Sequence, residues 1–176
     1  MQVGLSYTSI ENARNNRDTE VAGKSFNDVK NAARQTWNEM LGRIQVEGGT
    51  PEEKAKGKTG RYHSRLGRGI ANDINGQYMQ HDKTIGQIPL DKNGMPLYSH
   101  HKTDGMWGGF WNLTQIWTLA YPEICASYIK SNLDFFKNSG WLHDGEAAGV
   151  YTNGAQTNFH GLIICADYQD EFVIST

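Results

Sequence analysis

The sequence predicts a mainly helical domain built of consecutive αα-hairpins, with a short N-terminal strand and one β-hairpin excursion. Three observations lead to this prediction. Apolar residues recur every three or four positions in several long segments, which is the spacing of a helix with one buried face. Residues typical of helix starts and stops lie between these segments. The length of 176 residues is enough for one domain with a hydrophobic core.

The N-terminal part of the chain differs from the rest. Val3, Leu5 and Tyr7 alternate with smaller or polar neighbours, which is the two-residue period of a strand. The polar residues that follow are typical of an exposed connector. A single strand needs a partner sheet and little else nearby supplies one, so residues 1–24 hint that part of the protein lies upstream of this sequence. Residues 25–176 then form the helical domain.

Five helices are predicted in that domain. A cap followed by proline at Thr50-Pro51 indicates the start of the second helix. Gly140 is well placed to end the fourth. From their apolar spacing and end signals, the helices are expected over residues 27–44, 51–66, 107–120, 122–140 and 157–168.

Between the second and third helices the pattern is irregular. Residues 73–76 and 91–94 are turn signals. The second turn lies between two short apolar runs, so we expect it to close a small hairpin. Prolines in both runs restrict them to edge strands.

Composition and charge exclude several classes of function. The formal net charge is −2 and the basic residues are scattered, so the sequence indicates no nucleic-acid partner. No apolar run is long enough to cross a bilayer, and no signal peptide opens the chain, so no membrane association is expected. Cys125 and Cys165 both lie in apolar helical patterns, which favours buried thiols over a disulfide.

Residues 98–117 are the main candidate for a ligand site. They hold three of the five tryptophans, two histidines, a single acid and two amides. Aromatic faces with a few convergent polar groups suit a polar, ring-shaped ligand. The alternative is that the tryptophans belong to the core of a buried helix. The predicted substrate-binding residues are His101, Asp104, Trp107, Trp111, Asn112 and, in a later loop, Trp141.

Two other groups of side chains allow different interpretations. His100, His101 and Asp104 are residue types that bind divalent metals, but a third well-spaced ligand is not evident. Asp144 and Glu146 either act as the two carboxylates of glycoside hydrolysis or form a solvated acidic loop. The sequence does not give the distance that separates these alternatives.

Several stretches resemble glycoside hydrolase family 92, the calcium-dependent exo-acting α-mannosidases. The most specific one is RIQVEGGTPEEK (43–54). The others occur in the same order as in the family, and it is the series that carries the resemblance. They are VGLSYTSIENARNN (3–16), DINGQY (73–78), TDGMWGGFWNLTQIWTLAYPE (103–123) and NFHGLIICADY (158–168).

The resemblance implies that residues 1–24 are a strand and linker from an N-terminal β-domain outside this sequence, and that residues 25–176 are the N-terminal part of an (α/α)6 catalytic barrel. It also implies removal of terminal mannose, as by an α-1,2-mannosidase, with inversion of the anomeric centre. It also implies a calcium cofactor, a mannose-containing glycan or other α-linked oligosaccharide as substrate, and a secreted, periplasmic or cell-surface location. The protein's oligomeric state is left open.

The resemblance also bears on where the catalytic residues lie. The family's acid and base belong to segments of the types EGN and GNDD, and neither string occurs in this sequence. We therefore expect the acid and base downstream of Thr176, with the calcium ligands also outside this sequence. The 176 residues are accordingly expected to be an inactive fragment that contributes sugar-binding residues.

One departure from the family pattern concerns the substrate. The family carries a Trp-Asp-Thr tripeptide whose acid contacts the sugar, and alignment backwards from Pro122 puts its tryptophan at Trp107. The next residue is Gly108, and the nearest acid is Asp104, about one helical turn earlier. Asp104 is expected to replace the missing contact, or the protein binds a different sugar. A non-catalytic carbohydrate-binding or helical scaffold protein is the alternative function.

Overall fold

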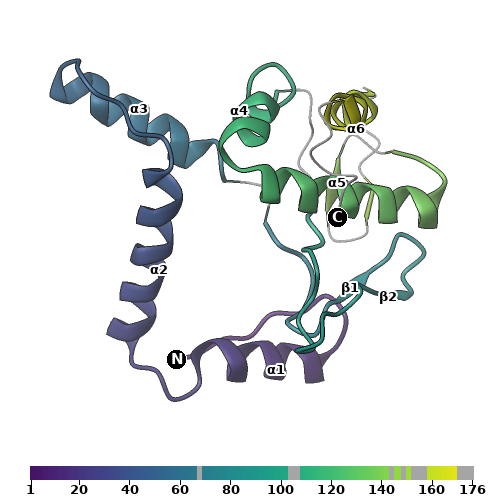
Figure 1. The fold of residues 1–176 in the computed structure, drawn as a ribbon. Coiled ribbons are helices and arrows are strands. Elements are labelled where there is room, and N and C mark those ends of the chain that lie inside the picture. The colour runs from purple at the N-terminus through teal and green to yellow at the C-terminus, as the bar shows by residue number, and fades with distance from the viewer. Residues whose placement is uncertain (67–68, 103–107, 143–144, 148–149, 152–157, 170–176) are drawn as a thin grey trace.

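The computed structural model describes the chain except for residues 67–68, 103–107, 143–144, 148–149, 152–157 and 170–176. The described part consists of helices, with two short antiparallel strand pairs (Figure 1). The prediction of a mainly helical domain with a β-hairpin is confirmed. The helices are α1 (Ile10–Val21), α2 (Phe26–Gly42), α3 (Pro51–His63), α4 (Leu113–Ala120), α5 (Pro122–Ser139) and α6 (Phe159–Gln169). The strands are β1 (Gln77–Met79), β2 (Ile85–Gln87), β3 (Glu146–Ala147) and β4 (Val150–Tyr151).

Local hydrogen bonds determine where several helices begin and end. Ser25 and Asp28 form a capping box at the start of α2, in which each side chain accepts a hydrogen bond from the other residue's backbone N–H. Thr50 and Glu53 do the same for α3. Gly140 ends α5 with a left-handed backbone, φ 78°. The predicted boundaries of these helices are confirmed to within a few residues.

The hydrophobic core lies among α4, α5 and α6. Trp117, predicted as a core residue, is only 4% exposed. The other buried members of the core are Leu113, Tyr121, Cys125, Tyr128, Ile129 and Ile163. Among the described residues, no helix is both long and apolar enough to cross a membrane.

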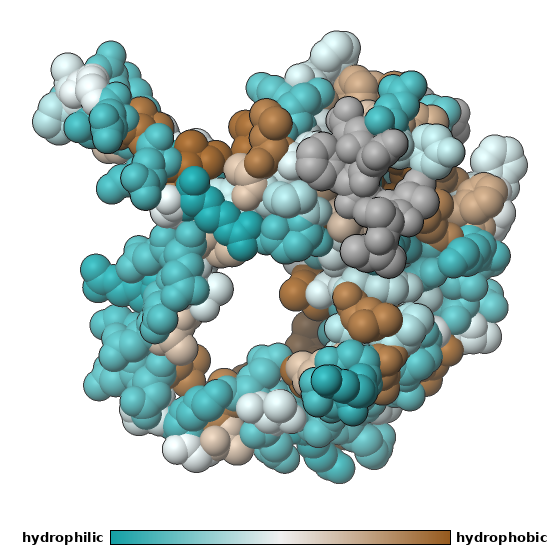
Figure 2. Space-filling model, in the orientation of Figure 1, coloured by the Kyte–Doolittle hydropathy of each residue, from teal (hydrophilic) through white to brown (hydrophobic). Residues whose placement is uncertain are grey.

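Helices α2 and α3 stand apart from this core. Figure 1 shows α2 leading from the end of α1 to α3, on the opposite side of the molecule from α6. Figure 2 shows an opening through the molecule beside α2. No residue of α2 or α3 is buried. We call these two helices and the loop between them the α2–α3 arm.

The prediction of an N-terminal strand is wrong. No strand is assigned at residues 3–7, and the expected connector forms α1 instead. Ser9 caps this helix by accepting a hydrogen bond from the backbone of Asn12 at 3.0 Å. Asn12 and Asn16 then donate to the carboxylate of Asp73, at 3.0 and 2.7 Å. Because α1 attaches through amides and not through an apolar stripe, hydrophobic periodicity did not reveal it.

The β-hairpin forms with a different pairing from the predicted one. The turn at residues 91–94 is present, with Gly94 N–H donating to the Asp91 carbonyl at 3.0 Å. Its flanks make only an isolated bridge between Leu90 and Pro96, and β2 pairs with β1 instead. Pro96 has no N–H to donate, which limits a ladder there.

Some predictions about α4 and α6 also need correction. The tryptophan-rich helix was expected from residue 107, but residues 108–112 form turns and α4 begins at Leu113. Ile116, predicted as a core residue, is exposed. Both cysteines are free, as predicted, but only Cys125 is buried. The reason is that α4 and α6 each pack on α5 with one face, so apolar residues on their other faces lie at the surface of this chain.

Candidate functional site

The predicted substrate-binding residues do not gather at one place in the described part of the chain. Asp104 and Trp107 lie outside the described residues. Trp111 precedes α4 and is 70% exposed, and Asn112 beside it is exposed. Trp141 follows the far end of α5 and is 72% exposed. Figure 1 shows that end of α5 pointing away from α4, so the two exposed tryptophans do not form one platform.

Trp111 belongs to a group of three aromatic rings where α4 and α6 begin. Phe110 stacks on Phe159, with ring centroids 4.6 Å apart. Trp111 meets both phenylalanines edge to face, at 6.1 and 6.2 Å. We call Phe110, Trp111 and Phe159 the aromatic step. It holds an exposed indole in a fixed setting, which suits stacking against a sugar ring.

A buried hydrogen bond and a ring contact fix the start of α6 next to the aromatic step. His160 follows Phe159 and is buried, and its Nε2 lies 2.8 Å from the hydroxyl of Tyr128 on α5. The ring of Tyr128 also meets Trp117 edge to face at 5.5 Å. Sequence reasoning missed both Phe159 and His160 as parts of this arrangement. The only available signal was an aromatic residue at the start of the last helix.

His101 lies in a buried polar network, away from solvent. Its backbone N–H donates to the Ser131 hydroxyl at 2.9 Å, and its Nε2 lies 2.9 Å from the Ser127 hydroxyl. The Ser131 hydroxyl is also 3.2 Å from Nδ1 of His100. The two serines lie one helical turn apart on α5 and hold the backbone of the segment before Thr103. His101 therefore has a structural role here, and direct contact with a ligand stays a prediction.

Burial changes the acidity of two groups near this network. Burial, together with the hydrogen bond that its hydroxyl donates to Asp134, raises the pKa of Tyr98. Burial likewise raises the pKa of the Cys125 thiol. A thiol with a raised pKa is a poor nucleophile, so Cys125 is a packing residue.

The hollows in the described part of the molecule include three of about 500 Å³ each. One, of about 500 Å³, runs between α4 and α6 beside the aromatic step and is lined by Phe110, Gln115 and Leu162 among others. A second, of about 480 Å³, lies between the segment holding Tyr98 and His101 and the start of α5.

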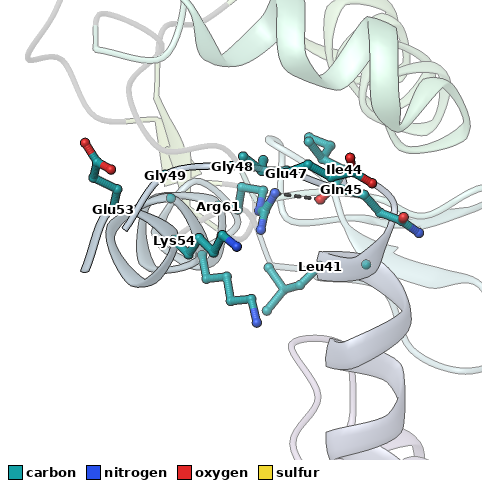
Figure 3. Close-up of a pocket in the computed structure, with 13 residues that line it drawn as sticks. Leu41, Ile44, Gln45, Glu47, Gly48, Gly49, Glu53, Lys54 and Arg61 are labelled. Carbon is teal, nitrogen blue, oxygen red and sulfur yellow. Dashed lines mark hydrogen bonds between the residues drawn. The ribbon is translucent and has the colours of Figure 1, made fainter. Parts of the chain in front are cut away.

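The third hollow, of about 530 Å³, lies inside the α2–α3 arm (Figure 3). Arg61 crosses it and donates to the carbonyl of Ile44 at 2.6 Å. The first hollow is the only one of the three that includes a residue of the aromatic step, so it is the best placed to extend a sugar site.

Comparison with known proteins identifies the family. A model of the glycosyl hydrolase family 92 catalytic domain matches residues 12–172. The chain belongs to glycoside hydrolase family 92. A search of curated protein sequences finds no match.

Solved structures agree in fold with this family 92 chain. It is similar to a family 92 α-mannosidase from Bacteroides thetaiotaomicron, with 23% identity and a TM-score of 0.81, over 97% of this chain and 22% of that one. The same α-mannosidase in complex with mannoimidazole gives the same identity and TM-score. A family 92 inverting mannosidase from the same organism is 22% identical, with a TM-score of 0.81 and 97% and 22% coverage. The chain thus spans about a fifth of the length of these structures. Its helices correspond to part of the (α/α)6 barrel fold.

Several carboxylates in the described part of this family 92 chain have structural partners. Asp134 accepts a hydrogen bond from Tyr98, and Glu123 pairs with Arg43. Asp73 accepts hydrogen bonds from the amides of α1. These three acids are therefore explained by the packing of the chain.

The predicted locations of the catalytic acids fall mostly beyond what the structure describes. Of the acid pair singled out in the sequence, Asp144 lies outside the described residues and Glu146 lies in β3. The family's acid and base were expected downstream of Thr176, and Thr176 itself also lies outside the described residues. That location therefore stays a prediction.

The described residues do not fit a calcium site. Within them, no group of three or more His, Cys, Asp or Glu side chains is placed to hold a metal ion. The carboxylate of Asp73 accepts hydrogen bonds from the hydroxyl of Ser6 and the amide nitrogens of Asn12 and Asn16, so it is already occupied by donors. Calcium prefers six to eight oxygen ligands, commonly with several carboxylates.

Proposed function

We propose that this chain is part of an α-mannosidase that removes terminal mannose from α-linked glycans with inversion, as an exo-acting α-1,2-mannosidase does. The observation that carries the proposal is the family 92 match over residues 12–172. The neighbouring structures include an inverting mannosidase and an α-mannosidase with bound mannoimidazole, which supports a mannose-containing substrate. Secretion, or a periplasmic or cell-surface location, is part of the same proposal.

In this proposal the chain supplies part of the sugar-binding wall. The exposed indole of Trp111 offers its face to a sugar ring, and the aromatic step keeps it in place. Asp104, Trp107 and Asn112 are near it in sequence and are proposed to contact the same sugar. His101 and Trp141 are proposed as more distant contributors.

The proposed reaction needs more than this segment. Inversion requires an acid that protonates the leaving oxygen and a base that activates water on the opposite side of the sugar, with carboxyls roughly 6.5–9.5 Å apart. We propose that both carboxylates follow Thr176 in the parent protein and that the ligands of the calcium ion also belong to other parts of it. The isolated 176-residue chain is then expected to be inactive.

The decisive experiment uses the full-length parent with α-linked mannosides. NMR of the first product should show β-mannose, the inverted anomer. Release of α-mannose would contradict inversion, and binding of mannosides without release would support the carbohydrate-binding alternative. Chelation of calcium should abolish turnover, and added calcium should restore it. Turnover by the isolated chain would contradict the proposed placement of the acid and base.

A matched pair of variants tests the role of the aromatic step. Trp111→Ala in the parent should raise KM about 3- to 10-fold, since an aromatic contact is worth roughly 0.5–1.5 kcal/mol. Trp141→Ala removes an equally exposed tryptophan at the other end of α5 and should change KM less. Equal effects of the two substitutions would remove the special role given to Trp111.

A further inference from the structure

The buried carboxylate of Asp73, a residue only 3% exposed, accepts hydrogen bonds from the N-terminal part of the chain. Its Oδ1 accepts one from the side-chain amide of Asn16 at 2.7 Å, and its Oδ2 accepts one from that of Asn12 at 3.0 Å. The hydroxyls of Ser6, at 2.9 Å, and Thr8 also donate to Oδ2. Among the residues that the structure describes, no basic side chain forms an ion pair with Asp73, so these four neutral donors compensate its buried charge. We call Asp73 and its four donors the Asp73 clamp.

The two asparagines of the clamp also bind the turn that leads into β1. The side-chain oxygen of Asn16 accepts a hydrogen bond from the backbone N–H of Ile74 at 2.9 Å. Asn12 accepts one from the amide of Asn75 at 3.0 Å and donates one to the side-chain oxygen of Gln77 at 2.6 Å. Figure 1 shows α1 beside β1 and β2, away from the core helices. Asn12 is the one buried residue of α1, so polar contacts hold this helix in place.

The chain on either side of the clamped turn contacts the segment that ends at Lys102. The backbone N–H of His100 donates to the side-chain oxygen of Asn72 at 2.8 Å, and Asn72 directly precedes the clamped carboxylate. The N–H of Lys102 donates to the carbonyl of Gly69 at 3.0 Å. In β1, the ring of Tyr78 stacks on the ring of His100, with centroids 4.0 Å apart. The clamp therefore lies between two supports of this segment.

We propose that Asp73 is a positioning residue, which clamps the N-terminal part of the chain onto residues 69–78 and thereby fixes residues 98–102. Those five residues open the stretch 98–117, the main candidate for the ligand site, and they include His101. Loss of the clamp should therefore loosen the start of the sugar-binding stretch. This consequence for the sugar rests on the proposed function, whereas the clamp itself does not.

Four backbone amides of residues 98–102 report separately on the two sides that hold this segment. The N–H groups of His100 and Lys102 donate to residues 69–72, beside the clamp. Those of Ser99 and His101 donate to serine hydroxyls of α5, at 2.9 Å each. A loosened clamp should speed hydrogen exchange at the first pair, while α5 continues to protect the second pair.

Asp73→Asn in the full-length parent tests the clamp. The substitution replaces one acceptor oxygen by an NH₂ group, which cannot accept the hydrogen bonds that it meets. Exchange resolved to single amides by mass spectrometry should be at least ~10-fold faster at His100 and Lys102, and less than ~2-fold faster at the two amides bonded to α5. Asp91→Asn is the matched control, because that carboxylate accepts hydrogen bonds within its own turn. It should leave all four rates unchanged.

A swap of the two groups tests whether the effect comes from the clamp. Asp73→Asn combined with Asn16→Asp exchanges amide and carboxylate, so one position can again donate to the other while an oxygen still faces the remaining donors. The double substitution should restore slow exchange, and a folded double variant that exchanges as fast as the single one would overturn the proposal. If Asp73→Asn prevents folding, Asn16→Ala removes one of the four donors and should accelerate the same two amides by a smaller factor.

Kinetics of the parent test the consequence for the sugar. Asp73→Asn should raise KM for α-mannosides about 3-fold and change kcat less than about 2-fold, because the loosened stretch holds substrate while the acid and base are proposed to lie elsewhere. The swap should restore KM as well. Unchanged exchange at His100 and Lys102 would overturn the clamp, and faster exchange with unchanged KM would overturn the positioning role. A wild-type parent without turnover would refute the proposed function, and the exchange rates would then decide the clamp alone.

Discussion

Helices α5 and α2 have nearly the same length, 18 and 17 residues, and each carries an apolar face. Their surroundings differ completely. Six residues of α5 are buried, whereas none of α2 is. An apolar stripe in the sequence therefore indicates that one face of a helix is suited to packing. It does not indicate which part of the protein packs against that face. The helices of the α2–α3 arm begin at capping boxes and contact the core only near the end of α2, whereas the core helices pack against one another along their length.

The contacts between the arm and the core centre on one aromatic ring, beside which Met40 and Ile44 pack against the core. Tyr121 joins α4 to α5, and the guanidinium groups of Arg43 and Arg65 lie over its ring, at 5.2 and 3.3 Å from the centroid. Its hydroxyl donates to the carbonyl of Met40 at the end of α2. Arg43 also pairs with Glu123 in the first turn of α5. The difference between the two regions can be tested on each side of this junction.

The largest effect is expected from a truncation in the core. Trp117→Ala should lower the free energy of unfolding of the 176-residue chain by about 3–5 kcal/mol, because it leaves a cavity against Tyr128. Trp37→Ala in the arm removes a half-buried ring and should cost about 1 kcal/mol. Denaturant unfolding followed by circular dichroism measures both. If the two substitutions cost the same, the contrast between core and arm is wrong.

Removing the hydroxyl at the junction should have a smaller and more local effect. Tyr121→Phe leaves the Met40 carbonyl without its donor and should cost about 1–2 kcal/mol. Hydrogen exchange should become faster in α2 and α3 while α5 is unchanged. Tyr62→Phe is the control, since Tyr62 is partly exposed and keeps its ring contact with Trp37. Faster exchange throughout α5 would show that the arm and core unfold as one unit.

The sequence was informative where structure depends on local signals. The caps at Ser25 and Thr50, the turn at residues 91–94 and the stop at Gly140 all follow from short patterns, and each is found. Helix α1 was missed because its contacts are polar. They reach from Asn12 to a carboxylate 61 residues away, which no local pattern reveals.

The candidate site was predictable in composition but not in arrangement. Trp111 was predicted to bind substrate, and it lies at the surface of this chain. Its neighbour Phe159 is far away in sequence, so only the fold brings the two together. Trp141 resembles Trp111 in residue type, but it follows the C-terminal end of α5, whereas Trp111 precedes α4. Ser127 and Ser131 of α5 form hydrogen bonds with His101, so the side chain that was predicted to bind a ligand is buried.

Alkaline pH should destabilise the chain through Tyr98, whose hydroxyl donates to Asp134 on α5. The pKa of Tyr98 is raised by burial and by Asp134, so the folded chain holds this proton more tightly than the unfolded chain does. The stability that results is present below the unfolded pKa of about 10 and is lost as the pH rises further. The free energy of unfolding, measured by denaturant titration above pH 9, should fall with pH, and less steeply in Tyr98→Phe. The exposed Tyr168, changed to Phe, is the control and should leave the slope unchanged.

Acid pH should produce the smallest effect, and it should be confined to the arm. The pKa of Asp28 is lowered by hydrogen bonds from the hydroxyl and backbone N–H of Ser25. Its contribution is therefore present above the unfolded pKa of about 3.9 and is lost as the pH falls through the lower folded pKa. Amide exchange in the first turn of α2 should become faster, relative to its intrinsic rate, as the pH drops from 5 to 2. Asp28→Ala should abolish this pH dependence. The first turn of α4 has no side-chain cap bond at Asn112, so its relative exchange should stay constant, and a parallel change there would indicate general unfolding.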